Sequence, residues 1–317
     1  MTDSGMISTL RGVVGIDIGG TNLRFGLVTE NGTIHSRVRM KTCTTRKGFL
    51  RQLVKGIDEL RENALSARCR LVSVGIGMPG LINRDGEILS SVNLDQCKGL
   101  KLAEELSSLT GLAVTVGNDA NAAACGEHRF GVGKTFSSFL MITIGTGVGG
   151  GLILGGRLWT GIDGFAGEFG HITVEPDGRP CSCGNHGCLE RYASASALVA
   201  DAQSMAGRKT ADWTAETLAE VAAAGDRQVA DLYARVGRYL GIASATVINL
   251  LNLEAIVIGG GVAASFPLWE EVMRQEINAR AFAPSARRVV LARGKLGDDA
   301  GVLGAAALAF AEFGGRT

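Results

Sequence analysis

A strand, a glycine-rich loop and a returning strand occur twice in this chain, and the repetition limits the folds that it can adopt. The first copy spans residues 13–28 and turns at 19–22, and the second spans 142–154 and turns at 145–149. Each copy predicts a β-hairpin with a polar tip. Two copies are too few for a solenoid, which needs at least three repeats, so we expect two similar lobes that face one another.

Helices are expected between the strands. In the first half, apolar residues recur at helical spacing and a strand at 71–76 follows them. These apolar residues are Phe49, Leu53, Ile57, Leu60 and Ala64. In the second half, a helical pattern through 232–247 precedes a strand at 255–258. The alternation of strand and helix predicts an α/β fold.

The length of 317 residues favours two domains, since a single core stops growing near ~250–300 residues. We expect an N-terminal lobe of residues 1–118, joined by a closing helix at 300–317. Residues 119–299 would form the second lobe, with a metal-binding loop at 171–190 and a cleft between the lobes. Hydrophobic residues make up 46% of the chain and charged residues 20%, which excludes a disordered protein.

The charge balance argues against a polyanionic partner. There are 32 Lys and Arg against 31 Asp and Glu, a net charge of +1, so no broad positive field favours nucleic acid or an anionic membrane. The N-terminus lacks a secretory pattern, and no run of ~18 apolar residues occurs. We therefore expect a cytoplasmic protein that acts on a small molecule.

Glycine is over-represented, with 46 residues against only five prolines, and we expect the excess in loops between strands. The loops at 17–21 and 145–149 each combine glycines, which let backbone amides approach an anion, with a Thr hydroxyl. No Lys follows, so neither is a Walker loop, and the returning strand argues against a dinucleotide fingerprint. One such loop alone could be an ordinary tight hairpin, but the pair favours a triphosphate site.

Asn118 and Asp119 follow the strand at 113–116 and precede an alanine-rich helix. One interpretation is a helix cap. The other is catalytic: a carboxylate at the carboxyl end of a strand lies where α/β sheets bind ligands and could accept a proton from an attacking hydroxyl. The two interpretations are compatible.

Three of the seven cysteines, Cys181, Cys183 and Cys188, lie close together after His171. The other four are scattered, which is unlike a disulfide framework. A Cys3His set predicts a closed structural zinc site. The alternatives are a cluster of buried thiols, or His186 in place of His171 as the fourth ligand.

Glu168 and Glu190 bracket this cluster, so a metal would stiffen the segment that carries them. Carboxylates suit sugar hydroxyls because each oxygen can accept hydrogen bonds. The alternative is that both are solvated surface charges.

Taken together, these segments resemble the ROK family of bacterial sugar kinases, and within it the glucokinases. The similarity extends from about Val13 to Ala307. It is carried by the motifs DIGGT, NDANAAACGE, TIGTGVGGG, AGEFGHI, CSCGNHGCLE, VIGGGV and GDDAGVLGAA. The resemblance implies a two-lobed actin-like ATPase (ribonuclease H-like) fold with a mixed sheet in each lobe. It also implies ATP and Mg²⁺ as cosubstrates, a structural Zn²⁺ and a homodimer.

The resemblance assigns roles to individual residues. Asp119 would be the general base for the 6-hydroxyl of a hexose, and His171 would touch both sugar and zinc. Hexose binding would involve Asn93, Asn118, Asp119, Glu168, His171 and Glu190. Nucleotide binding would involve Asp17, Gly19, Gly20, Thr21, Asn22, Gly145, Thr146, Gly147, Gly259, Gly260 and Gly261, with Asp17 near the Mg²⁺. The zinc ligands would be His171, Cys181, Cys183 and Cys188.

The implied reaction transfers the γ-phosphate of ATP to the 6-hydroxyl of a hexose, with glucose as the expected acceptor. One segment departs from the family pattern: glucokinases carry Asn-Leu-Pro-Gly-Trp where this chain has Asn93 followed by Leu-Asp-Gln-Cys. Fructose, mannose, allose, N-acetylglucosamine and N-acetylmannosamine therefore stay open as acceptors.

Two other functional classes are alternatives to a sugar kinase. ROK regulators bind DNA through an added helix-turn-helix domain, and about a dozen residues before the first strand leave no room for its recognition helix. A catalytically inactive sugar-binding protein is disfavoured by Asp119 and the two glycine loops.

Overall fold

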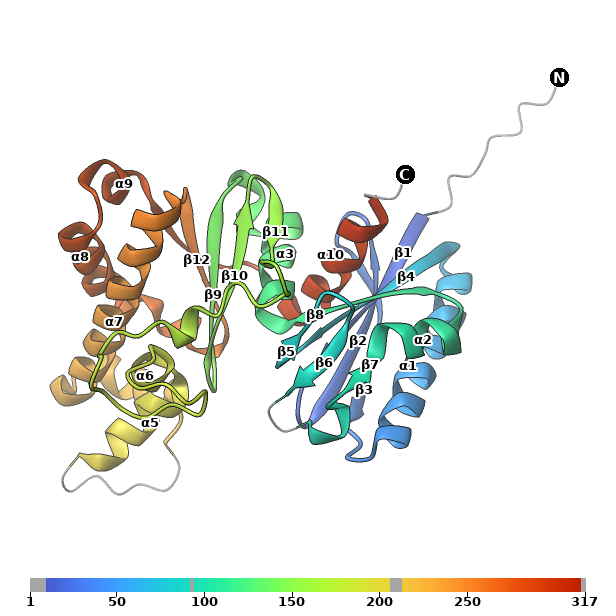
Figure 1. Ribbon diagram of the computed structural model, residues 1–317, viewed down its shortest axis with the longest axis horizontal. Helices are drawn as coiled ribbons and strands as arrows, with labels where there is room; N and C mark the ends of the chain where they lie inside the picture. Colours follow the sequence, from blue (N-terminus) through green and yellow to red (C-terminus); the bar gives the residue numbers. More distant parts are fainter. Residues whose placement is uncertain (1–9, 92–93, 206–212, 315–317) are drawn as a thin grey trace. The chain divides into compact units, whose positions relative to one another are not determined.

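The computed structural model describes residues 10–91, 94–205 and 213–314, whose helices and strands fall into two compact units (Figure 1). Unit 1 comprises Met1–Phe130, Gly161–Phe165 and Asp298–Thr317. Unit 2 comprises Gly131–Thr160 and Ala166–Gly297. The C-terminal segment thus returns to the unit in which the chain begins.

Unit 1 is built on a five-stranded mixed sheet with the order β3–β2–β1–β4–β8. Its strands are β1 (Leu10–Ile18), β2 (Asn22–Thr29), β3 (Ile34–Lys41), β4 (Cys69–Met78) and β8 (Ala113–Asn118). β1, β2 and β3 pair antiparallel, whereas β4 runs parallel to both β1 and β8. The carboxyl ends of β1, β4 and β8 therefore meet at one edge of the sheet.

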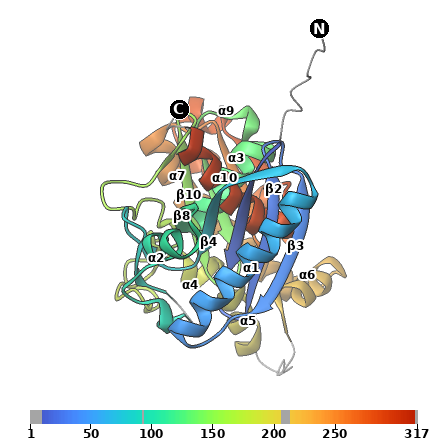
Figure 2. The ribbon, with the colours of Figure 1, turned by 90° about the vertical axis from the view of Figure 1, so that its right-hand side faces the viewer.

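Helices cover both faces of this sheet. Figure 2, which looks onto unit 1, shows α1 (Arg46–Ser66) in front of the sheet and α10 (Ala300–Gly314) behind it. The five apolar residues that predicted α1 are all buried on its inner side, so this helix is confirmed. α2 (Leu102–Thr110) packs beside α1, and α3 (Asp119–Phe130) packs along α10. A small antiparallel sheet adds β5 (Leu81–Ile82), β6 (Glu87–Ser90) and β7 (Leu100–Lys101).

The packing of α3 along α10 determines where unit 1 ends. Contacts group α3 with the first unit, so the division falls after Phe130. The sequence-based boundary after residue 118 was placed before this helix. A boundary set at the end of a strand cannot anticipate that the following helix packs on a partner from the far end of the chain.

Glycines inside the strands let α10 lie directly on the unit 1 sheet. A Cβ atom at Gly15 or Gly75 would overlap the carbonyl oxygen of Val302 or Ala305, and one at Gly26 would also crowd Val302. These glycines are in register across β2, β1 and β4. The expectation that the glycine excess lies in loops is therefore incomplete, because a row of glycines makes room for a helix.

Unit 2 repeats the sheet of unit 1. Its strand order is β11–β10–β9–β12–β13, with three antiparallel strands followed by two parallel ones. The strands are β9 (Phe139–Ile144), β10 (Val148–Leu154), β11 (Arg157–Trp159), β12 (Ala255–Gly259) and β13 (Val290–Arg293). The repeated hairpin of the sequence thus corresponds to a repeated five-stranded sheet.

The long helix α7 (Arg227–Leu251) organises the helical layer of unit 2. Its buried side includes Leu232, Val236 and Leu240, which confirms the helix expected there. α7 contacts all the other helices of this unit: α4 (Glu190–Ala193), α5 (Ala195–Ser204), α6 (Ala215–Ala223), α8 (Glu270–Arg280) and α9 (Ala283–Arg288). The Asp226 carboxylate caps its first turn by accepting a hydrogen bond from the Val229 amide at 3.1 Å.

Candidate functional site

The first glycine loop joins β1 to β2 at the edge where the parallel strands of unit 1 end. The Gly19 amide donates to the Asn22 carbonyl at 2.9 Å, which closes the turn. The Thr42 hydroxyl donates to the Gly19 carbonyl at 2.7 Å, and the Thr42 amide donates to the Thr21 carbonyl at 2.9 Å. Thr42, which follows β3, therefore holds the loop through two hydrogen bonds. Gly20 and Thr21 are exposed at the tip of the loop.

Asp17 lies at the end of β1, just before this loop. Its carboxylate Oδ2 is 4.0 Å from Nη1 of Arg24, the residue opposite it on β2. Desolvation raises the pKa of the Asp17 carboxyl above its usual value. The Arg24 charge opposes this rise, and the Asp119 charge adds to it. The two carboxyl groups are thus close enough to repel each other.

Of the two interpretations from the sequence, helix capping applies to Asn118, and the catalytic role stays a prediction for Asp119. The Asn118 side-chain oxygen accepts hydrogen bonds from the amides of Ala120 at 2.8 Å and Asn121 at 3.3 Å, so Asn118 caps α3. Its side-chain nitrogen donates to the Gly80 carbonyl at 3.2 Å, which ties the cap to the loop after β4. Because Asn118 caps the helix, the Asp119 carboxylate stays a candidate for the catalytic role.

Asp119 begins α3 at the same sheet edge as Asp17. Its Oδ1 accepts a hydrogen bond from the Ala120 amide at 2.9 Å. Desolvation by the surrounding protein raises the pKa of the Asp119 carboxyl, and the Ala120 hydrogen bond partly opposes the rise. Solvent nevertheless reaches this side chain. A carboxyl with a raised pKa and open access has the properties of a general base.

The second glycine loop joins β9 to β10 in unit 2 and closes in the same way. The Gly145 amide donates to the Gly147 carbonyl at 2.9 Å. Gly259 ends β12, the strand parallel to β9, so both glycine segments lie at one edge of this sheet. Gly260 has a φ of 84°, and a Cβ there would overlap the Ile144 carbonyl oxygen. Exposed Gly260 and Gly261 thus pass close to the base of the second loop.

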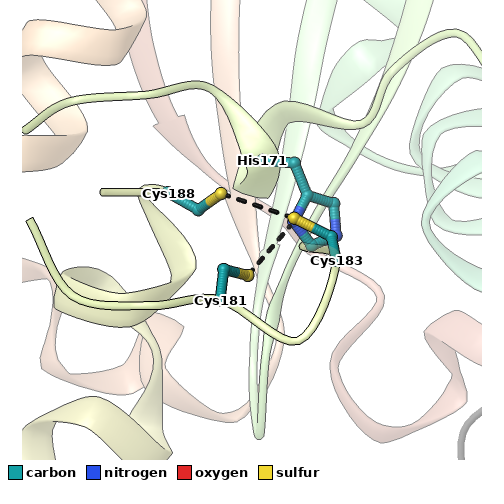
Figure 3. A group of neighbouring side chains, drawn as sticks. All are labelled: His171, Cys181, Cys183 and Cys188. Atoms are coloured by element: carbon teal, nitrogen blue, oxygen red, sulfur yellow. Dashed lines mark hydrogen bonds between the residues drawn. The ribbon is translucent and has the colours of Figure 1, made fainter. Parts of the chain in front are cut away.

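Four predicted zinc ligands meet in unit 2 (Figure 3). Their donor atoms all lie within 4.8 Å of one another; the residues are His171, Cys181, Cys183 and Cys188. Cys183 Sγ is 3.6 Å from Cys188 Sγ, and Cys181 Sγ is 3.7 Å from His171 Nδ1. The cluster joins the short 3-10 helix Phe169–His171 to the segment that precedes α4.

The two donor distances of 3.6 and 3.7 Å fit a tetrahedral zinc ion. Zn–S bonds of ~2.3 Å and a Zn–N bond of ~2.0 Å place neighbouring donors roughly 3.5–3.8 Å apart in a tetrahedron. A disulfide would instead bring two sulfurs to ~2.05 Å, and all three cysteines are free. Desolvation and the nearby thiols raise the pKa of the Cys188 thiol. The exposed His186 lies outside this set.

The surroundings of the cluster orient its ligands. Nε2 of His171, the nitrogen away from Cys181, is 3.9 Å from Glu168 Oε2. The Asn185 side-chain nitrogen lies 3.5 Å from Cys188 Sγ and donates to the Thr173 hydroxyl at 2.9 Å. Asn185 is not among the predicted site residues, although its place in the Cys-Gly-Asn-His-Gly-Cys run could have indicated it.

Glu190 does not simply face solvent. Its Oε2 accepts a hydrogen bond from the Val148 amide at 3.1 Å, at the end of the second glycine loop. Gly147 lies directly beneath this carboxylate, because a Cβ at Gly147 would overlap Oε2. No pattern in the sequence predicts this contact between Glu190 and the loop.

The predicted site residues thus form two sets. Unit 1 carries Asp17, the residues 19–22, Asn118 and Asp119 along one sheet edge. Unit 2 carries Glu168, His171, Glu190, the second glycine loop, residues 259–261 and the cysteines. Asn93 lies outside the described residues. The roles of these residues in binding and catalysis stay predictions.

No described helix has both the length and the apolar character needed to cross a membrane.

Known proteins provide an independent comparison. The glucokinase of Streptomyces coelicolor is 36% identical to this chain over 312 residues, which cover 93% of this chain and 96% of that protein. The xylose repressor of Caldicellulosiruptor bescii is 30% identical over 313 residues, covering 95% of this chain and 78% of the repressor. Relatives therefore include both a kinase and a regulator.

Solved structures agree with the expected fold. The ROK hexokinase from Thermus thermophilus has a TM-score of 0.83 and 32% identity, covering 96% of this chain and 99% of that chain. The ROK glucokinase from Streptomyces griseus, in complex with glucose and AMPPNP, has a TM-score of 0.78 and 34% identity, covering 94% and 98%. The α/β actin-like ATPase fold is thereby confirmed. The ROK family model matches residues 13–312, and the chain belongs to the ROK family.

Proposed function

We propose that this protein is an ATP-dependent hexose kinase that phosphorylates the 6-hydroxyl of its sugar. The observation that carries the proposal is the edge of the unit 1 sheet, where an accessible carboxyl, Asp119, lies near Asp17 and the first glycine loop. An acceptor base and a phosphate loop are the two parts that phosphoryl transfer to an alcohol needs. The kinases among the relatives support the same conclusion.

Asp119 would act on the sugar hydroxyl. As a carboxylate, it would accept the proton of the 6-hydroxyl while the oxygen attacks the γ-phosphorus of ATP, the bond to the β–γ bridging oxygen breaks and ADP leaves. Its raised pKa makes it a better proton acceptor than an ordinary aspartate. The hydrogen bond from the Ala120 amide would orient the carboxylate during the transfer.

The glycine loops would hold the phosphates of the donor. At the exposed loop tips, the amides of Gly20, Thr21 and Thr146 would donate to phosphate oxygens, and the Thr21 and Thr146 hydroxyls would add donors. Gly259, Gly260 and Gly261 would pass beside the adenosine. The Asp17 carboxylate would help to hold Mg²⁺, which prefers oxygen ligands and neutralises charge on the phosphates when bound.

The acceptor would be glucose, bound by Asn93, Asn118, Glu168, His171 and Glu190. His171 Nε2 and the Glu168 carboxylate lie near each other, so one hydroxyl could contact both. The residues after Asn93 differ from those of ROK glucokinases, so other acceptors are alternatives. These are fructose, mannose, allose, N-acetylglucosamine and N-acetylmannosamine.

The Cys3His cluster would hold one structural Zn²⁺. The ion supplies a rigid crosslink between the segments of His171 and Cys188 when bound. The His171 imidazole would then keep a fixed orientation, with its Nε2 directed toward Glu168.

A sugar-responsive regulator is the second candidate function. The xylose repressors among the relatives favour it, because they match over most of this chain. The matched region covers 78% of that repressor. We further expect a cytoplasmic homodimer that binds no nucleic acid and no membrane, which light scattering and a DNA-binding assay would check.

An ATP-consumption assay over a panel of hexoses tests the proposal. The wild type should convert ATP to ADP only with a hexose present and should rank glucose first. Asp119→Ala should lower turnover by roughly 10²- to 10⁴-fold while zinc content and melting temperature stay near wild type. Turnover that survives in this variant would remove Asp119 from the role of base. Sugar binding without any turnover in the wild type would favour the regulator.

A further inference from the structure

The short helix α4 lies against the second glycine loop through contacts at both of its ends. At its start, Glu190 Oε2 accepts a hydrogen bond from the Val148 amide at 3.1 Å. Just past its end, the Ala195 amide donates to the Gly145 carbonyl at 2.9 Å. Two hydrogen bonds thus fix the loop on either side of Thr146, the residue at its exposed tip.

Gly147 indicates that the Glu190 contact is built into the loop. A Cβ at this position would overlap Glu190 Oε2, so any other residue would push the carboxylate away. Gly147 is not among the glycines with a positive φ. Close approach to the carboxylate, and not backbone strain, is therefore the reason that the structure shows for a glycine here.

The same helix continues directly from the metal cluster. Cys188 precedes Glu190 by two residues, and both Cys188 and the intervening Leu189 are buried. The Leu189 amide donates to the Ile172 carbonyl at 2.9 Å, beside the ligand His171. The Arg191 amide donates to the Cys188 carbonyl at 2.9 Å. A rigid cluster would consequently hold the start of α4 in place.

We propose that Glu190 is a positioning residue for the phosphates of the nucleotide, in addition to its proposed contact with the sugar. Its carboxylate fixes the second glycine loop, and α4 connects this loop to the Cys3His cluster. A rigid cluster would therefore keep the loop amides in position for the phosphates of the nucleotide. A carboxylate has two oxygens, so Oε1 can accept from a sugar hydroxyl while Oε2 holds Val148. This inference rests on the proposed function, because it takes the loop to bind a nucleotide.

The test measures nucleotide binding without sugar. Calorimetry would give the Kd of Mg·ADP for the wild type, for Glu190→Ala and for the matched control Glu168→Ala. Both variants remove a carboxylate proposed to bind sugar, and Glu190 is the one that accepts the hydrogen bond from the Val148 amide. Because Glu190→Ala removes the acceptor that fixes the loop, we expect it to weaken Mg·ADP binding by about tenfold, which corresponds to ~1.4 kcal/mol. Glu168→Ala should change it by less than about twofold.

A second variant keeps the test decisive if Glu190→Ala does not fold. Gly147→Ala keeps the carboxylate but displaces it, and should weaken Mg·ADP binding in the same direction. Amide exchange at Val148 should become faster in Glu190→Ala and stay unchanged in Glu168→Ala. Wild-type affinity for Mg·ADP in folded Glu190→Ala would overturn the inference.

The outcomes also separate this inference from the proposed function. If no hexose is phosphorylated but Mg·ADP binding still depends on Glu190, the kinase proposal fails and the positioning role stands. If hexoses are phosphorylated and Mg·ADP binding ignores Glu190, the positioning role fails alone.

Discussion

Gly301 lies so close to Asp17 that a Cβ on Gly301 would sit 2.5 Å from the carboxyl carbon of Asp17. Glycine within a helix is normally worse than alanine by roughly 0.5–1 kcal/mol. Here we expect the opposite: Gly301→Ala should destabilise the protein by about 1–3 kcal/mol, because it overpacks the start of α10 against a carboxyl group. Urea unfolding would measure the loss.

A double-mutant cycle identifies the cause of that loss. An Asp17→Ala background removes the carboxyl group, the closest part of the overlap, and keeps only Cβ at 2.9 Å, so the cost of Gly301→Ala should shrink by at least ~0.5 kcal/mol. A cost that stays the same in both backgrounds would show that Asp17 is not the group that excludes the methyl.

The raised pKa values of Asp17 and Asp119 predict how stability changes with pH. Between the ordinary aspartate value of ~3.9 and the raised pKa, the folded protein binds more protons than the unfolded chain. Stability from these carboxyls is therefore complete below the ordinary pKa and is lost as pH rises through the raised one. Because the two groups interact, this loss belongs to the pair.

Asp119→Asn tests this sign. The variant lacks the desolvated charge, so it should be more stable than the wild type at pH 7, and the difference should shrink toward pH 4. Chemical unfolding of both proteins at several pH values would measure it. A variant that is less stable than the wild type at pH 7 would contradict the desolvation of Asp119.

Asn118→Ala should cost about 1 kcal/mol, because it removes the side-chain acceptor for the Ala120 and Asn121 amides at the start of α3. Asn118→Ser should recover most of the loss, since serine is also a good capping residue. Thermal unfolding of the three proteins would measure the difference. Equal losses for both substitutions would mean that the amide group matters chiefly through Gly80.

Cys183→Ser and Cys188→Ser should each abolish the roughly one equivalent of zinc per chain that we expect in the purified protein. Cys43→Ser is a matched control, because Cys43 is a partly exposed free thiol outside the cluster. Elemental analysis would count the metal, and limited proteolysis would report opening of the segment at 171–190. A metal-free preparation that is folded and active would exclude the zinc site.

Gly187 and Gly184 offer a matched pair in the metal-binding segment. Both have positive φ angles, 70° and 93°, so alanine is strained at either position. A Cβ at Gly187 would also overlap the Glu175 carbonyl oxygen, whereas nothing lies within 4 Å at Gly184. Gly187→Ala should therefore lower the melting temperature clearly more than Gly184→Ala does.

Local patterns in the sequence predicted much of this fold. The spacing from Phe49 to Ala64 specified α1, and the repeated hairpins specified two similar sheets. Both signals are local, because side-chain periodicity and turn residues act over a few positions. The clustering of the four ligand residues was also predictable, since three of them lie within eight positions of sequence.

Contacts between distant segments could not be predicted in this way. The hydrogen bond from Val148 to Glu190 joins residues 42 positions apart, and no spacing rule connects an amide to a carboxylate at that range. Gly15, Gly26 and Gly75 lie in strands that the sequence predicted, but no local pattern indicates that a helix from the far end of the chain packs on them. Asn185 was overlooked because its neighbours were better candidate ligands.

The matching strand orders of the two sheets suggest a history. A half-chain that was copied and joined to itself would produce this arrangement, with one glycine loop descending from the same ancestor as the other. The copies have since diverged: two positions before the first loop glycine stands Asp17 in one sheet and Thr143 in the other. The two similar sheets thus supply an acidic side chain at this position to the first glycine loop and a hydroxyl to the second.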